Sequence, residues 1–261
     1  MRDRRRVPAA LAISAVVAAG FLLAPLIALL GRTPWRRMGE ILTDGATVEV
    51  LTLSLSSAAA ATLACLVLGV PLAWVLAHTG PVLRRMLRVL VTVPMVAPPV
   101  VGGVALLAAY GRRGIAGEPV YELFGVALPF TTAAVVTAQT FVALPFCVLA
   151  VEGALRGIDY EYVEAAAVMG AGRWQIFRRV TLPLAAPGVA AGAVLSFARA
   201  LGEFGATLTF AGSLAGVTRT APLAIYQALD ADPAVAYGLS VLLLAVAATV
   251  LLSLRDTWWP R

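Results

Sequence analysis

Six long apolar segments separated by short polar ones constrain the fold of this chain more than any other feature. A helix needs about 20 mostly apolar residues to cross a bilayer. Segments of that length cover 8–30, 48–77, 89–110, 129–151, 182–211 and 233–254. The charged fraction of the chain is only 13%, about half of what soluble domains carry. The sequence therefore predicts an all-α integral membrane protein with six transmembrane helices.

The arginines set the expected orientation, because the cytoplasmic segments of membrane proteins are enriched in positive charge. With the N-terminus placed inside, thirteen arginines fall in the inner segments and six in the outer ones, while Arg199 lies within a span. We therefore expect both termini in the cytoplasm. The inner segment at 152–181 is then the longest polar stretch between two spans.

Several classes of function lack the residues that they need. All 20 basic residues are arginine, so a phosphate-binding loop of the form G-x-x-x-x-G-K-[ST] is impossible. The sequence lacks the H-E-x-x-H motif that would indicate an integral-membrane enzyme. Glu203 is the only acidic residue well inside a predicted span. Cys65 and Cys147 have no metal-binding spacing and are interpreted as small buried hydrophobes. We expect no catalytic residue, no metal site, no cofactor in this chain and no nucleic-acid partner.

The inner segment has the pattern of two short helices joined at a glycine. Asp159 is a suitable N-cap for the first helix, and Gly170 suits its C-terminal end. A second helix is expected from Arg173 to Arg179, before Pro183 opens the fifth span.

Two interpretations of this segment remain open from the residues alone. Ala165, Ala166 and Ala167 give the first helix a slim face that fits a groove on another protein, with Trp174 and Phe177 as apolar anchors. A solvated loop whose amphipathic helix rests on lipid explains the same pattern equally well.

Two spans carry residues that are unusual in a bilayer. Arg199 and Glu203 are four residues apart, so we expect them on one helix face, either as a gate near the outer mouth or as a pair that joins helices. Pro94, Pro98 and Pro99 predict a broken third span that lines the transport pathway. Ordinary membrane helices also contain proline, so a purely structural role stays open.

The inner segment resembles the EAA motif of ABC-importer permeases. Glu164-Ala165-Ala166 with Gly170 match E-A-A-x-x-x-G, and Phe177, Val180, Leu182 and Pro183 match the F-x-x-V-x-L-P that follows. The resemblance implies the type I ABC importer permease fold. It also implies that this segment is the coupling helix, which docks on a separate ATP-binding subunit. The coupling residues are then Glu164, Ala165, Ala166, Gly170, Arg173 and Phe177.

Other stretches resemble the sulfate/molybdate branch of these permeases. They are Val93-Pro94 with Pro98-Pro99-Val100, and the run from Ala198 through Arg199, Gly202, Glu203 and Phe204 to Ala206. The outer stretch Thr218-Arg219-Thr220 is most like molybdate permeases. The resemblance implies that Pro98, Pro99, Arg199, Gly202, Glu203 and Phe204 form the gate and pathway. It further implies that Thr218, Arg219 and Thr220 contact a binding protein.

The resemblance implies a complete importer in a bacterial plasma (inner) membrane. Its parts are two copies of this chain, two ATP-binding subunits that hold ATP and Mg²⁺, and a periplasmic or lipid-anchored oxyanion-binding protein. The expected division is an N-terminal helix and interfacial segment (1–44), a type-1 permease domain (45–254) and a cytoplasmic tail (255–261). The cargo that the resemblance implies is molybdate, with the chemically similar tungstate as a second ion. Sulfate or thiosulfate import is the alternative, and an ATP-independent carrier that uses Arg199 and Glu203 is a more distant one.

Overall fold

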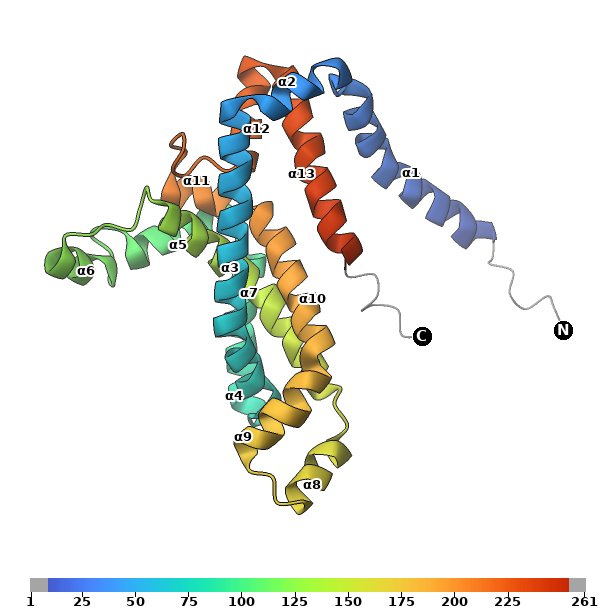
Figure 1. Cartoon of the computed structure of the whole chain (residues 1–261), viewed down its shortest axis with the longest axis vertical. Helices are drawn as coiled ribbons and strands as arrows, with labels where there is room; N and C mark the ends of the chain where they lie inside the picture. The colour runs from blue at the N-terminus through green and yellow to red at the C-terminus, as the bar shows by residue number, and fades with distance from the viewer. Residues whose placement is uncertain (1–8, 254–261) are drawn as a thin grey trace.

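The computed structural model describes residues 9–253, and the chain is helical over most of them (Figure 1). Five helices are long and apolar enough to cross a membrane, and a bent pair of helices makes a sixth span if it is counted as one. The all-α prediction is confirmed. The arginines expected near the N-terminus and the tail at 255–261 lie outside the described residues.

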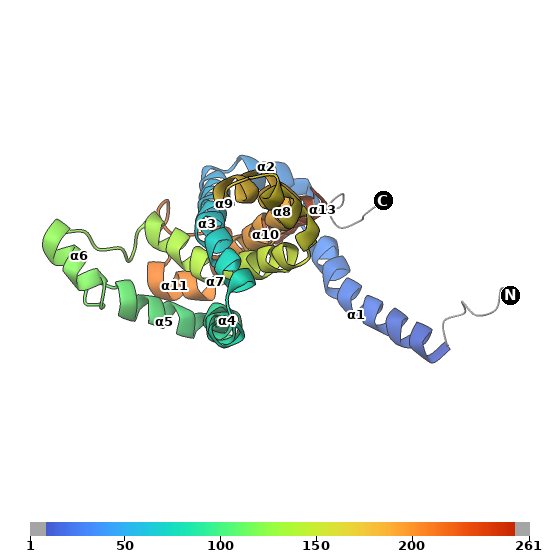
Figure 2. The ribbon, with the colours of Figure 1, turned by 90° about the horizontal axis from the view of Figure 1, so that it is seen from below.

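Three helices form the centre of the molecule: α3 (Gly45–His78), α7 (Thr132–Arg156) and α10 (Leu182–Leu201). They lie side by side in Figures 1 and 2 and pack against one another, with α7 the most buried of the three. Small side chains fill their contacts, among them Ala61, Cys65, Ala143 and Cys147. Such residues let helix backbones approach closely, which is how helices associate in lipid.

The first and last described helices lie beside this bundle. Helix α1 (Ala9–Arg32) has no buried residue in its most apolar stretch, stands apart in Figure 1, and contacts α13 (Pro233–Ser253). A 3₁₀ turn, η2 (Trp35–Arg37), and α2 (Met38–Thr43) connect α1 to α3 within the segment expected to be interfacial. The interior of the fold is therefore built without α1.

The third span is two helices rather than one. Helices α4 (Pro81–Val96) and α5 (Pro99–Tyr110) meet at an angle of 116°. The predicted break is confirmed, and it lies at Pro98 and Pro99. The helix breaks there because both residues lack an N–H and because a residue before proline avoids the helical region. Pro94 lies inside α4 and does not end it. A short helix, α6 (Gly117–Phe124), follows α5.

The fifth span is also interrupted, and here the prediction of one helix over 182–211 was wrong. Helix α10 ends at Leu201, and α11 (Gly205–Ala211) begins after a break of three residues. Arg199 therefore lies in the last turn of α10, whereas Glu203 lies beyond it. The outer segment that follows contains a helix that was not expected, α12 (Ala221–Ala231).

The inner segment differs from its prediction at both ends. Residues 152–156 belong to α7, so the connection begins only at Gly157. Helix α8 (Tyr160–Val168) is followed by α9 (Arg173–Ile176), which continues through a π-helical turn, η3 (Phe177–Thr181), directly into α10. The expected separate second helix is thus the first part of a span of 29 residues, Arg173–Leu201.

Candidate functional site

Helix α8 has the caps that its sequence predicted. The Asp159 carboxylate accepts the N–H of Glu161 at 3.1 Å. At the other end Gly170 has φ +85°, in the left-handed region that favours glycine. The N–H of Ala171 donates to the carbonyl of Ala166 at 3.1 Å, and that of Gly170 to Ala167 at 3.0 Å. This pair of hydrogen bonds is the Schellman arrangement, which fixes a sharp end to the helix.

The turn after α8 presents apolar side chains to the outside. Val168 is 88% exposed and Met169 is 81% exposed. Trp174 is also largely exposed, and so are Glu164, Ala165, Gly170 and Arg173, whereas Ala166 is buried. We call residues 157–181 the coupling segment. Its exposed apolar tip lies at the end of the molecule opposite α2 and α12 (Figure 1), a placement that suits contact with another protein or with lipid.

Aromatic rings join the coupling segment to the end of α3. The ring of Phe177 stacks on Trp174, with centroids 5.4 Å apart, and meets the ring of Trp74 edge-on at 5.0 Å. Trp74 in turn stacks on His78 at 4.0 Å. A cavity of about 220 Å³ lies beside these rings. Phe177 therefore faces the bundle, and the coupling segment contacts α3 through these rings as well as continuing into α10.

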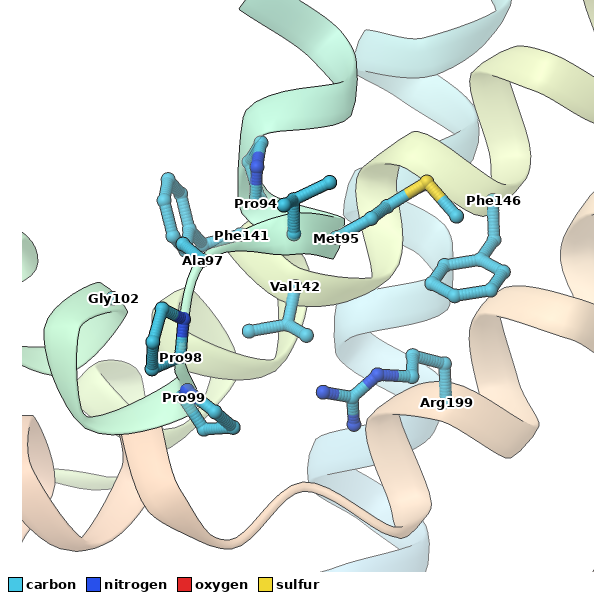
Figure 3. Close-up of a pocket in the computed structure, with 11 residues that line it drawn as sticks. Pro94, Met95, Ala97, Pro98, Pro99, Gly102, Phe141, Val142, Phe146 and Arg199 are labelled. Carbon is cyan, nitrogen blue, oxygen red and sulfur yellow. The ribbon is translucent and has the colours of Figure 1, made fainter.

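A second cavity of about 260 Å³ lies where the third span breaks, and we call it the gate pocket. Pro98, Pro99 and Phe141 lie on one side of it, Phe146 lies on the opposite side, and Arg199 of α10 lies below them in Figure 3. Among the described residues that line it, Arg199 alone is charged. The pocket combines apolar walls with a single cation.

Arg199 and Glu203 are paired, although they do not share a helix. The guanidinium Nη2 of Arg199 lies 2.6 Å from Oε2 of Glu203, whose side chain is 1% exposed. The other carboxylate oxygen, Oε1, accepts the N–H of Ala206 at 2.9 Å and so caps α11. The carboxylate thus ties the end of α10 to the start of α11 across the break. Pairing of this kind is what a buried charge requires.

The remaining expected gate residues point elsewhere. Gly202 and Phe204 line a separate open pocket, where the Phe204 ring packs on Tyr226 with centroids 5.2 Å apart. The structure therefore brings Pro98, Pro99 and Arg199 together, with Glu203 attached through its ion pair.

The expected contact residues for a binding protein lie in the connection between α11 and α12. Thr218 and Thr220 are fully buried, and the Thr218 hydroxyl accepts the N–H of Leu214 at 2.8 Å. Arg219 is half-buried. The exposed residues of this connection are Leu214, Ala215, Gly216 and Val217. Contact with a partner through Thr218, Arg219 and Thr220 stays a prediction.

Sequence reasoning missed a cluster of charges around a buried carboxylate at the C-terminal end of α7. The side chain of Glu152 is 3% exposed and pairs with Arg88 of α4 and, at 3.5 Å, with Arg156. The sequence places Glu152 in the polar segment 152–181 because it follows an apolar run. A charged residue at that position gives no indication in the sequence that its side chain is buried. Within residues 9–253 no group of three His, Cys, Asp or Glu side chains is placed to hold a metal ion.

Comparison with known proteins agrees with these features. The model of the family described as "Binding-protein-dependent transport system inner membrane component" matches residues 69–258. The chain is 51% identical over 242 residues, 92% of its length and 90% of the relative's, to the molybdenum transport system permease protein ModB of Mycobacterium tuberculosis. It is 38% identical to the ModB of Escherichia coli, over 85% of this chain and 96% of that one. The sulfate transport system permease protein CysT of Escherichia coli is 34% identical, over 90% and 86% of the two chains.

Solved structures show the same fold at low sequence identity. A bacterial ABC transporter that imports the polysaccharide alginate matches with a TM-score of 0.73 at 17% identity, over 95% of this chain and 93% of that one. The MetNI methionine ABC transporter matches with a TM-score of 0.60 at 21% identity, over 82% and 99%. The fold is therefore the expected type I ABC importer permease fold, and this chain belongs to the family of binding-protein-dependent transport system inner membrane components.

Proposed function

We propose that this chain is the membrane-spanning subunit of an ATP-driven importer of molybdate, and that tungstate shares the route. The observation that carries the proposal is the 51% identity, over 92% of the chain, to a molybdenum transport permease. The identity to the sulfate permease CysT is 34% over a similar length. Sulfate import is therefore the second candidate.

The proposed assembly places two copies of this chain in a bacterial inner membrane with both termini in the cytoplasm. Two ATP-binding subunits bind ATP and Mg²⁺, and each receives the exposed tip formed by Val168, Met169 and Trp174. A periplasmic or lipid-anchored protein delivers the oxyanion on the side of α12. The permease itself performs no bond chemistry and supplies the pathway.

Transport follows from the continuity between the coupling segment and the gate pocket. Closure of the ATP-binding subunits moves α9, and the helix from Arg173 to Leu201 has no break between its two ends. Arg199 lies about 33 Å along this helix from Phe177 at 1.5 Å per residue. Movement of α9 therefore shifts Arg199 relative to the Pro98–Pro99 corner, and this opens one side of the pathway or the other.

The gate pocket suits passage rather than tight capture of a dianion. Its walls are apolar and Arg199 is neutralised by Glu203. A site that held molybdate strongly would release it slowly, since conduction requires weak binding along the route. We assign selection of the oxyanion to the binding protein.

Uptake by a reconstituted complex tests the proposal. Proteoliposomes that contain this chain, its ATP-binding subunit and its binding protein should accumulate labelled molybdate only when ATP is present. Unlabelled tungstate should compete, and sulfate should compete far more weakly. Stronger competition by sulfate would favour the second candidate. Sustained accumulation by this chain without the ATP-binding subunit would overturn both importer readings.

A further inference from the structure

A further cavity, separate from the pockets described above, is lined by arginine. It has a volume of about 560 Å³ and lies between α4 and the lower end of α7. The residues that line it are Pro81, Arg84, Arg85, Arg88, Val89, Thr92 and Arg156. It lies at the same end of the molecule as the coupling segment, as the positions of α4, α8 and α9 in Figure 1 show. We call it the arginine pocket.

The charges of the arginine pocket do not balance. Glu152, the buried carboxylate, pairs with Arg88 and Arg156. Arg84 donates to the backbone carbonyls of Leu76 at 3.0 Å and Thr79 at 2.6 Å, which are neutral acceptors. Four guanidinium groups against one carboxylate leave a formal charge of +3 in this part of the described chain.

Three of the four guanidinium groups are held in place. The buried Glu152 fixes Arg88 and Arg156, and the end of α3 fixes Arg84. Each guanidinium has five N–H donors, and these contacts use only some of them. Donors that are already positioned lose little entropy when they bind an anion. Planar guanidinium groups match tetrahedral oxyanions because two N–H groups can reach two oxygens.

We propose that the arginine pocket binds a tetrahedral oxyanion group, with Arg85 as the arginine free to contact it. Two sources carry this chemistry. One is the phosphate of an anionic lipid, since basic pockets between membrane helices at the cytoplasmic side bind such headgroups. The other is a free oxyanion, such as phosphate, sulfate or molybdate. The lipid phosphate is favoured, because Val82, Met86 and Leu90 of α4 are exposed and offer an apolar surface for acyl chains. The proposal does not depend on which ion the importer carries.

Thermal unfolding of the full chain in a neutral detergent tests this site. The unfolding midpoint is followed while one of three probes is added: short-chain phosphatidylglycerol, short-chain phosphatidylcholine, or sodium sulfate against sodium chloride at equal ionic strength. A ligand that binds only the folded state raises the midpoint with its concentration, which yields an apparent affinity. We expect phosphatidylglycerol to raise the midpoint more than phosphatidylcholine.

The variants assign any response to the pocket. Arg85→Gln removes an exposed guanidinium and leaves both pairs of Glu152 intact, so the protein should fold. It should weaken the apparent affinity by about tenfold, which is close to the low end for a hydrogen bond to a charged group. Arg36→Gln, in η2 next to α2 and so at the opposite end of the molecule from α4 (Figure 1), makes the same change in net charge and should respond like wild type.

The outcomes separate the two sources and decide the proposal. A response to phosphatidylglycerol alone identifies the lipid phosphate, and a response to sulfate identifies the free oxyanion. Either supports the site if Arg85→Gln weakens it and Arg36→Gln does not. No response to any probe, or equal responses in the two variants, would overturn it.

Discussion

Replacement of Gly170 by valine tests whether the end of α8 must be sharp. Gly170 has φ +85°, and no atom lies within 4 Å of the position that a Cβ would take. The effect of a side chain there is therefore backbone strain and not collision. A residue with a Cβ costs about 1–2 kcal/mol in the left-handed region, and a β-branched one about 2 kcal/mol, because its side chain is stiff. Since 1.4 kcal/mol is a factor of ten, Gly170→Val should open this turn about 30-fold more often.

The chain offers a matched control two residues away. Gly172 has φ −69° and ψ 159°, which any residue adopts, and it also has open space around its Cα. Gly172→Val should change local stability by less than about 0.5 kcal/mol, as for other exposed sites. Its N–H can still donate to the side chain of Gln175, as it does at 3.1 Å.

Hydrogen exchange measures the local effect directly. The amide of Ala171 donates to the carbonyl of Ala166, so its exchange reports on the opening of the turn. In Gly170→Val this amide should exchange about 30-fold faster than in wild type, and in Gly172→Val less than about threefold faster. In the reconstituted complex Gly170→Val should hydrolyse ATP with reduced transport. Equal exchange rates in the two variants, or full coupling in Gly170→Val, would refute the reasoning.

Three further changes test the gate and its links. A double-mutant cycle with Arg199→Gln and Glu203→Gln should give a coupling energy of about 2 kcal/mol in the free energy of unfolding, since Glu203 is buried and Arg199 is partly exposed. If the effects of the two changes were simply additive, the ion pair would not contribute to stability. Gly103→Ala should destabilise the protein by about 1–3 kcal/mol, because its Cβ would lie 2.5 Å from a side chain of α11. Gly153→Ala, where the Cβ meets open space, should be neutral or stabilising. Similar thermal unfolding midpoints for the two variants would contradict this packing. Trp74→Leu removes a ring contact of about 1 kcal/mol and should lower the transport per ATP hydrolysed; an unchanged ratio would mean that α3 takes no part in coupling.

Much of the fold was predictable because lipid imposes a simple rule on helix length. The positions of the long helices and the caps at Asp159 and Gly170 follow from local residue types and were predicted from the sequence. The break at Pro98 was predicted as well, because proline removes an N–H wherever it lies. These features depend on nearby residues in the sequence.

The features that sequence reasoning missed depend on tertiary contacts. The break after Leu201 has no proline, and it is held by Glu203, which caps α11 and pairs with Arg199. The burial of Glu152 requires Arg88 to lie on a neighbouring helix, 64 residues earlier. Neither pairing is visible in a local pattern of hydrophobicity. Candidate residues could thus be found by type, whereas their partners could not.

The two broken spans have a common consequence. Helices α5 and α11, which follow the breaks, pack so tightly that a Cβ on Gly205 would lie 2.6 Å from that of Pro99, and a Cβ on Gly103 would lie 3.0 Å from the carbonyl of Ala206. Neither helix can slide past the other without a steric clash. We therefore expect the two helices to move as one unit about the breaks at 97–98 and 202–204. Rotation about both breaks together, against the unbroken α7 on which both helices pack, is the motion that we expect of this unit.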